Sequence, residues 1–270
     1  MIVSKDNNQV KLFRKLAKKK WRYQENLVPL EGYRLIKEAY KSGAELKFIL
    51  FNSRLIKNQD IFDLLKILEH MGIPIHEVKE EILREVAFTE TPQGILGAAK
   101  FHILEIDTLF RSQKKLLIVF GVQDPGNLGT LMRSAEAFSW DALICLKGTV
   151  DPSNDKAIRS SMGSFFNLKI SVDAAVPNLI DKARQYGCFI VAGDGRATLS
   201  VEEIRLNSTP IALLSGNEAR GITEFPFHLC SRGMFKKVAI PMSARTDSLN
   251  VAVASSILMY ELSKKIHNTG

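Results

Sequence analysis

Three segments in the second half of the chain contain amide, carboxylate and guanidinium side chains, the groups that commonly hold ligands, and the first two also contain glycines. The first reads Gly121-Val-Gln-Asp-Pro-Gly-Asn-Leu-Gly-Thr-Leu-Met-Arg133. Its Pro-Gly pair is typical of a turn, and Asn127 is predicted to cap the helix that follows. Arg133 lies about a turn and a half into that helix, where its guanidinium could reach the end of the preceding strand. The alternative is an ordinary surface pair with Glu136.

The second segment reads Leu214-Ser-Gly-Asn-Glu-Ala-Arg-Gly-Ile222 and follows an apolar strand. Gly216 would let the backbone approach a ligand closely, and exposed backbone groups there could read an adenine edge. Glu218 would orient a polar or cationic partner. A tight charged turn without a ligand explains this segment equally well.

The third segment follows a predicted strand that ends at Pro241, and a long helix comes after it. Asp247 or Ser248 is predicted to cap that helix. The hydroxyl of Ser248 and the amide of Asn250 suit the binding of a nucleotide, although both side chains are also ordinary caps. Small residues at the start of the helix favour close helix packing.

The elements that must position these segments are strands and helices in alternation. Strands are predicted over 116–120, 142–146, 189–192, 211–215 and 238–241, and helices over 127–138, 176–186 and 248–266. Continuous apolar strands that alternate with helices indicate a parallel sheet covered on both faces. Ligands bind beyond the carboxyl ends of the strands in such a sheet.

The loop after residue 120 lacks the dinucleotide fingerprint. It contains no Gly-x-Gly-x-x-Gly, and no acidic residue ends the next strand at Leu146-Lys147. A nicotinamide-binding fold and the usual open-sheet methyltransferase fold need both features. A nucleotide-dependent oxidoreductase is therefore disfavoured.

The first hundred residues predict a separate small α/β unit. Helices are predicted over 30–42, 60–71 and 80–86, and strands over 46–51, 74–78 and 94–101. This order indicates a self-contained layered sandwich. Residues 102–115 mix apolar and charged side chains, so we place the domain boundary there.

Positive charge is concentrated near the N-terminus of a chain whose formal net charge is +8. One short stretch contains Lys11, Arg14, Lys15, Lys18, Lys19, Lys20 and Arg22. Such a focused field predicts contact with a polyanion such as RNA. A solvated basic helix face is the alternative.

The remaining composition is that of a globular protein, with 46% hydrophobic and 24% charged residues. Apolar runs are of strand length, and the first residues show no signal-peptide pattern. Cys145, Cys188 and Cys230 are too widely spaced to indicate a metal site or a disulfide framework. We expect a cytoplasmic protein with no membrane segment and no metal.

The three segments, in this order, resemble the signature motifs of the SpoU-type (TrmH-like) RNA 2′-O-ribose methyltransferases of the SPOUT class. Asp-Pro-Gly-Asn-Leu-Gly with Arg133 is similar to the first motif, Ser-Gly-Asn-Glu-Ala-Arg-Gly to the second, and Ile-Pro-Met…Ser-Leu-Asn-Val-Ala-Val-Ala to the third. The resemblance covers roughly 116–265. It is looser over 8–101, where Leu27–Ala39 is similar to the opening helix of the family's RNA-binding domain.

The resemblance implies an α/β fold whose C-terminal parallel-sheet domain contains a deep trefoil knot, preceded by a small α/β RNA-binding domain like a small ribosomal protein. It implies a basic N-terminal arm over 1–20, the RNA-binding domain over 21–104, a linker over 105–115 and the catalytic domain over 116–270. Family members act as homodimers. A knot would be an exception to the rule against threaded connections.

The resemblance also assigns roles to residues. S-adenosylmethionine would bind against Gly216, Asn217, Ile240, Met242 and Leu249. The catalytic set would be Arg133, Asn127, Glu218, Ser248 and Asn250. Arg133 would stabilise the developing alkoxide, because a guanidinium is a very poor base; a role as general base stays open.

Ribosomal RNA, and 23S RNA above all, is the predicted substrate, because the separate N-terminal domain resembles the ribosomal-RNA branch of the family. Transfer RNA is an alternative substrate. An alternative of a different class is a non-catalytic RNA-binding protein of ribosome assembly that retains the knot.

Overall fold

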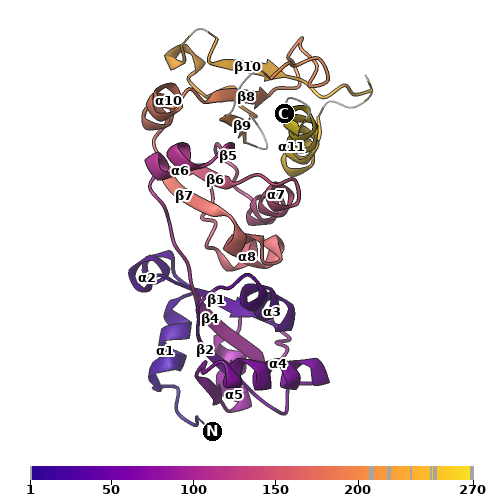
Figure 1. The fold of residues 1–270 in the computed structure, drawn as a ribbon. Coiled ribbons are helices and arrows are strands. Elements are labelled where there is room, and N and C mark those ends of the chain that lie inside the picture. The colour runs from indigo at the N-terminus through magenta and orange to yellow at the C-terminus, as the bar shows by residue number, and fades with distance from the viewer. Residues whose placement is uncertain are drawn as a thin grey trace. The chain divides into compact units, whose positions relative to one another are not determined.

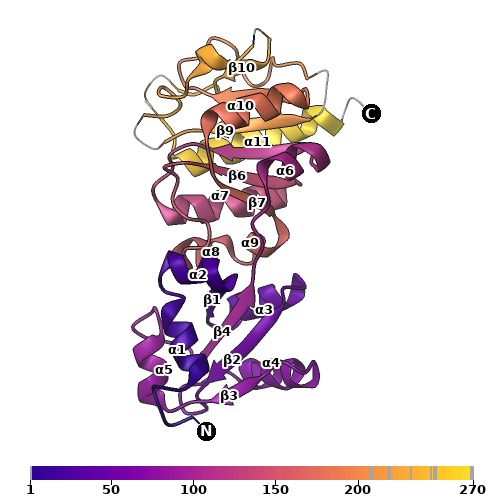
Figure 2. The same cartoon turned by 90° about the vertical axis from the view of Figure 1, so that its left-hand side faces the viewer.

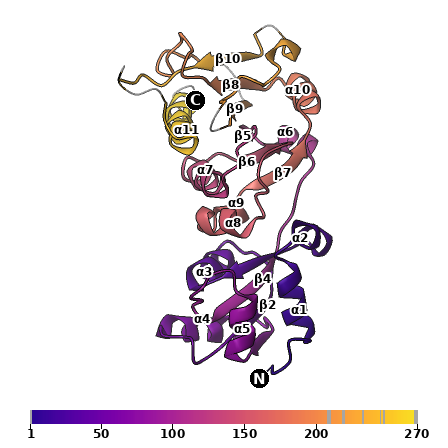
Figure 3. The same cartoon turned by 180° about the vertical axis from the view of Figure 1, so that it is seen from behind.

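The structure is a computed structural model that describes residues 2–206, 210–217, 220–231, 233–243, 245 and 248–267. It divides the chain into two compact units, which Figures 1, 2 and 3 show from three sides. Unit 1 consists of Met1–His102 and Ser153–Phe166, and unit 2 of Ile103–Pro152 and Asn167–Gly270. The sequence had placed residues 116–270 in one continuous domain, so the assignment of 153–166 differs from that expectation.

Unit 1 is built on a four-stranded sheet with the order β1-β4-β2-β3. Its strands are β1 (Leu27–Glu31), β2 (Leu46–Phe51), β3 (Ile75–Glu77) and β4 (Ile95–Lys100). β4 runs antiparallel to β1 and β2, and β3 pairs parallel with β2. The apolar stretches predicted as strands over 46–51, 74–78 and 94–101 therefore form strands close to their expected bounds.

The helix predicted over 30–42 was wrong at its start, because β1 ends at Glu31 and the helix begins at Tyr33. Gly32 between them has a φ of 91°, a left-handed conformation that favours glycine. Pro29 lies inside β1, which is an edge strand, where a missing backbone N–H is tolerated.

Helices cover both faces of this sheet. They are α1 (Asn8–Lys15), α2 (Lys19–Glu25), α3 (Tyr33–Lys41), α4 (Gln59–His70) and α5 (Glu80–Val86). α1 and α5 lie on one face and α3 and α4 on the other (Figure 2). Val10, Phe13 and Leu16 are buried in the same core cluster as α5, so part of the predicted basic arm belongs to the folded unit.

Residues 153–166 contain α8 (Asp155–Ser161) and most of α9 (Ser164–Asn167). α8 packs near β1, and its Ala157 and Ile158 are fully buried. Gly163 lies so close to Glu38 of α3 that a Cβ there would overlap the Glu38 side chain. These contacts explain why the segment belongs to unit 1.

Unit 2 is built on a six-stranded sheet with the order β10-β8-β9-β5-β6-β7, in which every pair is parallel. Its strands are β5 (Lys115–Val119), β6 (Ala142–Leu146), β7 (Lys169–Ala174), β8 (Phe189–Gly193), β9 (Ile211–Ser215) and β10 (Phe235–Val238). The predicted parallel sheet is thus present. β10 ends at Val238, whereas the sequence predicted that a strand begins there.

Helices again cover both faces (Figures 1 and 3). They are α6 (Ile106–Ser112), α7 (Pro125–Ala137), α10 (Val176–Gln185) and α11 (Val251–His267), and a short 3-10 turn covers Phe227–Leu229. α6 and α10 lie on one face and α7 and α11 on the other. Within the described residues, no helix is both long and apolar enough to cross a membrane.

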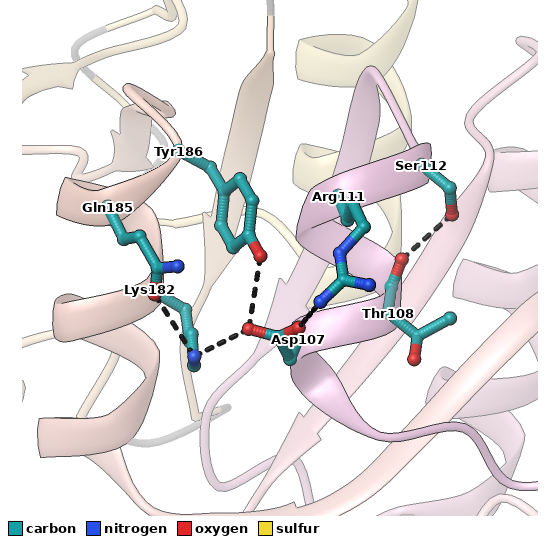
Figure 4. A network of polar contacts seen from close by, with 7 residues as sticks. All are labelled: Asp107, Thr108, Arg111, Ser112, Lys182, Gln185 and Tyr186. Carbon is teal, nitrogen blue, oxygen red and sulfur yellow. Dashed lines mark hydrogen bonds and ion pairs between the residues drawn. The ribbon is translucent and has the colours of Figure 1, made fainter.

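The segment 105–115, predicted as a linker, is folded in the structure. Ile106, Leu109 and Phe110 of α6 are buried in the core of unit 2. A polar network also joins α6 to α10 (Figure 4). In it Asp107 accepts hydrogen bonds from Lys182 and from the Tyr186 hydroxyl, the latter at 3.1 Å.

The Asp107 network predicts a pH-dependent stability. The hydrogen bond from Lys182, together with the one from Tyr186, lowers the pKa of the Asp107 carboxyl from its ordinary value of 3.8. The ionised carboxylate therefore stabilises the fold above pH 3.8, and this contribution is lost as the pH falls through the lowered pKa. Asp107→Asn should reduce the urea midpoint at neutral pH, and the difference from wild type should shrink in acid.

Asp181→Asn is the matched control, because among the described residues Asp181 forms only an exposed pair with Arg184 on the same helix α10. It should change the midpoint little at either pH. If the urea midpoint of Asp107→Asn differs from that of wild type by the same amount at neutral and acid pH, the stabilising role of the ionised Asp107 carboxylate is contradicted.

Candidate active site

A cavity of about 600 Å³ lies at the carboxyl edge of the parallel sheet in unit 2. Four stretches of chain line it: the ends of β8, β9 and β10 with the loops that follow them, and the start of α11. Its volume is in the range typical of small-molecule sites. The predicted rule that ligands bind beyond the strand ends therefore selects the same edge as the cavity.

The register of the sheet brings these loops together. Val119 pairs with Ser215, Leu214 with Ala192, and Gly193 with Val238, so four strands end at nearly the same level. The segments that follow them come from very different positions in the sequence. Parallel pairing is thus the physical reason why they meet at one site.

Gly216 is required by a close approach of backbone to backbone. Asn217 N donates to Gly221 O at 2.9 Å and Gly221 N to Asn217 O at 2.8 Å, which closes a narrow loop. A Cβ at residue 216 would overlap the backbone of Gly221 and Ile222. The prediction that Gly216 permits close backbone approach therefore has a direct explanation, although here the approaching chain is the loop itself.

Asn217 connects the second motif to the first. Its Nδ2 donates to Gly121 O at 2.7 Å, and its Oδ1 accepts from the Arg220 backbone at 3.1 Å. Asn217 also lies on the cavity wall. Much of its side-chain hydrogen-bonding capacity is therefore used to hold the loop in place.

The first and third motifs meet at a hydrogen bond between two predicted catalytic residues. Asn250 Nδ2 donates to Asn127 Oδ1 at 3.0 Å. Asn250 Oδ1 accepts from the backbone of Ala252 at 2.9 Å and of Val253 at 3.3 Å, so Asn250 caps α11. The caps predicted from sequence at Asp247 or Ser248 are replaced by Asn250, and Asp247 lies outside the described residues.

The cap predicted at Asn127 was also wrong. α7 begins at Pro125, and Asp124 accepts a hydrogen bond from Asn127 N at 2.8 Å. Proline is favoured at the first helical position because its missing N–H costs nothing there. The Asn127 side chain is therefore available for Asn250.

Direct contacts hold α11 against α7 and the sheet. Ser134 and Ser256 share a hydrogen bond of 2.6 Å, and Ser215 and Ser255 one of 2.7 Å. Trp140 is 2% exposed, and its Nε1 donates to Ser263 Oγ at 3.1 Å. The small residues at the start of α11 thus permit the close packing that the sequence predicted.

Arg133 is exposed on α7. Among the described residues it has no hydrogen-bond or ion-pair partner, and Glu136, the alternative partner considered from sequence, accepts from Asn167 instead. An exposed guanidinium in the second half of α7 is free to contact an anion. The surface pair with Glu136 is thus not formed.

The predicted site residues differ in whether they line the cavity. Gly216, Asn217, Ile240, Met242, Ser248 and Leu249 line the cavity. Asn127, Arg133 and Asn250 are not part of its lining. Glu218 lies outside the described residues, so its predicted role stays a prediction.

Sequence reasoning missed the loop after β8. Asp194 lines the cavity, with its side chain only 9% exposed. Burial alone would raise the pKa of this carboxyl, but hydrogen bonds from the Arg196 backbone and from Lys237 outweigh it, and the pKa lies below its ordinary value of 3.8. The signal that could have found it is its position after a predicted strand, at the edge where the other loops lie.

The predicted RNA-binding cations lie on α1, on α2 and in the turn between them. All except Arg22 are exposed. Arg22 is 4% exposed, and its guanidinium donates to Leu16 O, Ala17 O and Ser153 Oγ. Because a buried guanidinium is not accessible to a phosphate, Arg22 does not belong to the RNA-binding set.

Two family models match the chain. The SpoU rRNA Methylase family matches residues 114–260, more than half of the chain, and the MRM3-like substrate binding domain matches residues 7–97. The chain belongs to the SpoU rRNA methylase family. The resemblance inferred from the three motifs is therefore confirmed.

Several relatives are similar over most of their length. A Bacillus subtilis protein named 23S rRNA (guanosine(2553)-2′-O)-methyltransferase RlmP is 33% identical over 97% of this chain and 98% of its own. Human mitochondrial rRNA methyltransferase 3 is 28% identical over 89% of this chain and 68% of its own. The crystal structure of an AdoMet-bound rRNA methyltransferase from Sinorhizobium meliloti matches with a TM-score of 0.81 and 27% identity, over 97% of each chain.

The cavity of this SpoU family member fits S-adenosylmethionine. Leu249, Ile240 and Met242 offer apolar surface for an adenine ring and a thioether-like chain, and Asp194 offers a carboxylate to a cationic group. The predicted cofactor is thereby supported by the chemistry of the lining as well as by the family. Among the described residues, no group of His, Cys, Asp or Glu could hold a metal ion.

The loop closed over Gly216 gives a direct test. Gly216→Ala forces the chain at Gly221 to move, and overpacking of this kind costs about 1–3 kcal/mol. Affinity for S-adenosylmethionine, measured by calorimetry, should fall roughly tenfold or more. Gly195→Ala is the control, because Gly195 lines the same cavity and its Cβ position is open. Equal losses of S-adenosylmethionine affinity in both variants would show that the added methyl group acts by filling the cavity and that the loop clash is not the cause.

Proposed function

We propose that this protein transfers the methyl group of S-adenosylmethionine to a ribose 2′-hydroxyl of ribosomal RNA, with 23S RNA as the favoured substrate. The observation that carries the proposal is the hydrogen bond between Asn250 and Asn127, residues 123 positions apart, beside the cavity-lining start of α11. The similarity to the Bacillus subtilis 23S rRNA methyltransferase over nearly the whole chain supports the choice of substrate.

Bound S-adenosylmethionine supplies an activated methyl group. The protein's own residues therefore have to bind the two reactants, align the ribose hydroxyl with the methyl group and stabilise the charge that develops. As the ribose oxygen forms its bond to the methyl carbon, the methyl–sulfur bond of the donor breaks and the hydroxyl proton passes to water, so negative charge develops on the oxygen during the attack. Arg133, exposed and without an internal partner among the described residues, stabilises that charge or the adjacent phosphate. Base catalysis by Arg133 is the less favourable role, because its guanidinium stays protonated.

The remaining residues position the reactants. Asn127 and Asn250 hold the start of α7 to the start of α11, which fixes the helix that carries Arg133. Gly216, Asn217, Ile240, Met242 and Leu249 form the donor site, with Asp194 added to the predicted set. The proposed catalytic set also includes Ser248, which lines the same cavity, and Glu218. Alignment of this kind supplies much of the rate in a reaction whose leaving group is already activated.

Unit 1 is the proposed RNA-binding part, and it includes the matched substrate binding domain and the exposed cations of 1–20. We propose that the catalytic domain covers residues 116–270, of which residues 153–166 pack in unit 1. We also propose that the catalytic domain contains a deep trefoil knot and that the protein is cytoplasmic. Transfer RNA and a non-catalytic assembly role are the alternatives.

The deciding experiment is a map of 2′-O-methylation across total RNA from cells with and without the protein. One ribosomal RNA position should lose its methyl group in the deletion strain and regain it with the wild-type gene. Arg133→Ala should bind S-adenosylmethionine normally and lower transfer by about 10²-fold or more, as removal of one transition-state donor does.

Arg205→Ala is the matched control, because Arg205 is exposed like Arg133 but lies outside the three motifs and the predicted catalytic set. Expressed in the deletion strain, this variant should restore the methyl group of the ribosomal RNA position fully. A change at a transfer RNA position would favour the alternative substrate, and full activity of Arg133→Ala would refute the role of Arg133.

We also propose that the protein acts as a homodimer through the outer face of α11. Val253 is 47% exposed and Tyr260 48% exposed, and residues seven apart lie on one helix face. An apolar helix face beside the active site suits a second copy of the chain. Tyr260→Glu should shift the sedimentation coefficient from that of two chains to that of one.

Met71→Glu serves as the control for this dimer, because Met71 is 64% exposed on unit 1, outside the proposed interface. The charge added there should leave the sedimentation coefficient unchanged. A wild-type protein that sediments as a single chain would refute the dimer.

A further inference from the structure

The corner between α1 and α2 is held in one geometry by a buried arginine. The Arg22 guanidinium donates to Leu16 O and Ala17 O, both at 3.0 Å, and to Ser153 Oγ at 2.9 Å. Leu16 itself is fully buried. A buried charge with three hydrogen bonds fixes the backbone around it, so the side chains that this corner presents have defined positions. α1 and α2 follow one another through this short turn (Figure 2).

Trp21 is the aromatic side chain presented at that corner. It is half-buried, and lysine side chains surround its ring. Lys15 Nζ lies 4.4 Å from the ring centroid and Lys20 Nζ 5.8 Å, both within cation–π range. Both lysines are exposed, and a lysine ammonium stays hydrated, so the part of the Trp21 ring that they approach borders solvent.

The neighbouring cations differ in their availability. Lys11 pairs with Asp6 at 2.9 Å and Arg14 with Glu85 at 3.4 Å, so both are partly neutralised. The ammonium groups of Lys15 and Lys20 lie against Trp21 instead of a carboxylate. They can move to a phosphate at small cost, because a lysine stem is long and flexible.

An aromatic ring flanked by mobile cations matches one kind of ligand, an unpaired nucleotide. The base would stack on the indole, and the phosphates on either side would take the two ammonium groups. Paired bases are stacked inside a helix and offer no free face to a side chain. A duplex would therefore meet only the charge of this corner and not its ring.

We propose that Trp21, with Lys15 and Lys20, is a stacking platform for an unpaired base of the substrate RNA. This inference rests on the proposed function, since it assumes an RNA substrate. It adds that the RNA near unit 1 is a loop, bulge or single strand. Trp21 then contributes preference for unpaired RNA, whereas the other exposed lysines contribute charge.

Tryptophan fluorescence tests the platform, because the chain has only two tryptophans and the other one, Trp140, is 2% exposed. A single-stranded RNA of about 10 nucleotides should quench the emission of the full-length protein, and a duplex of equal charge should not. Trp21→Phe, which keeps an aromatic face, should bind the single strand nearly as well and show no quenching. Trp21→Ala should bind it about 5-fold to 100-fold more weakly, with duplex affinity unchanged.

A charge control separates stacking from general attraction. Lys66→Gln removes an exposed lysine on α4, at a distance along the chain from the corner, and should change the affinity for single-stranded RNA less than Lys15→Gln. Bound single-stranded RNA that leaves the emission unchanged would overturn the platform, as would equal losses of single-strand and duplex binding in Trp21→Ala. Failure of wild-type protein to bind either RNA would instead remove the proposed function, and the platform with it.

Discussion

The packing of α11 against α7 is the constraint on which the candidate active site depends. Asn127 and Asn250 can share a hydrogen bond only if the starts of the two helices lie side by side. Serine pairs and the Trp140 indole secure that arrangement along the length of α11. Because the same start of α11 also lines the cavity, one helix position sets both the proposed methyl-donor site and the helix that carries Arg133.

Charged groups in this chain have two distinct uses. Lysines of the basic corner lie on the surface, whereas Arg22 within the same run is buried and fully engaged by two carbonyls and a hydroxyl. A buried ion needs such partners, because its loss of hydration is otherwise too costly. Asp107 and Asp194 follow the same logic, since each carboxylate is held by cations and has a lowered pKa.

Periodicity and apolar runs predicted the sheet of unit 2 well, because buried parallel strands such as β6 and β9 are continuous apolar stretches. The missed elements have weaker patterns: β7 is no continuous apolar stretch, since Lys169 and Asp173 in it are exposed, and charged residues surround the short apolar positions of α6. The motifs predicted most of the cavity lining. The contact of Asp194 with Lys237 and the inward orientation of Arg22 depend on tertiary packing, which local sequence does not encode.

The proposed donor cavity is formed by four stretches of chain that meet only when the sheet is complete. A ligand with such a site binds the folded protein and has no equivalent site on the unfolded chain, so mass action links its concentration to folding. Donor present at about 100 times its dissociation constant would add about 2.7 kcal/mol to the free energy of unfolding. The supply of methyl donor in the cell would thereby govern how long the enzyme survives proteolysis, in addition to how fast it works.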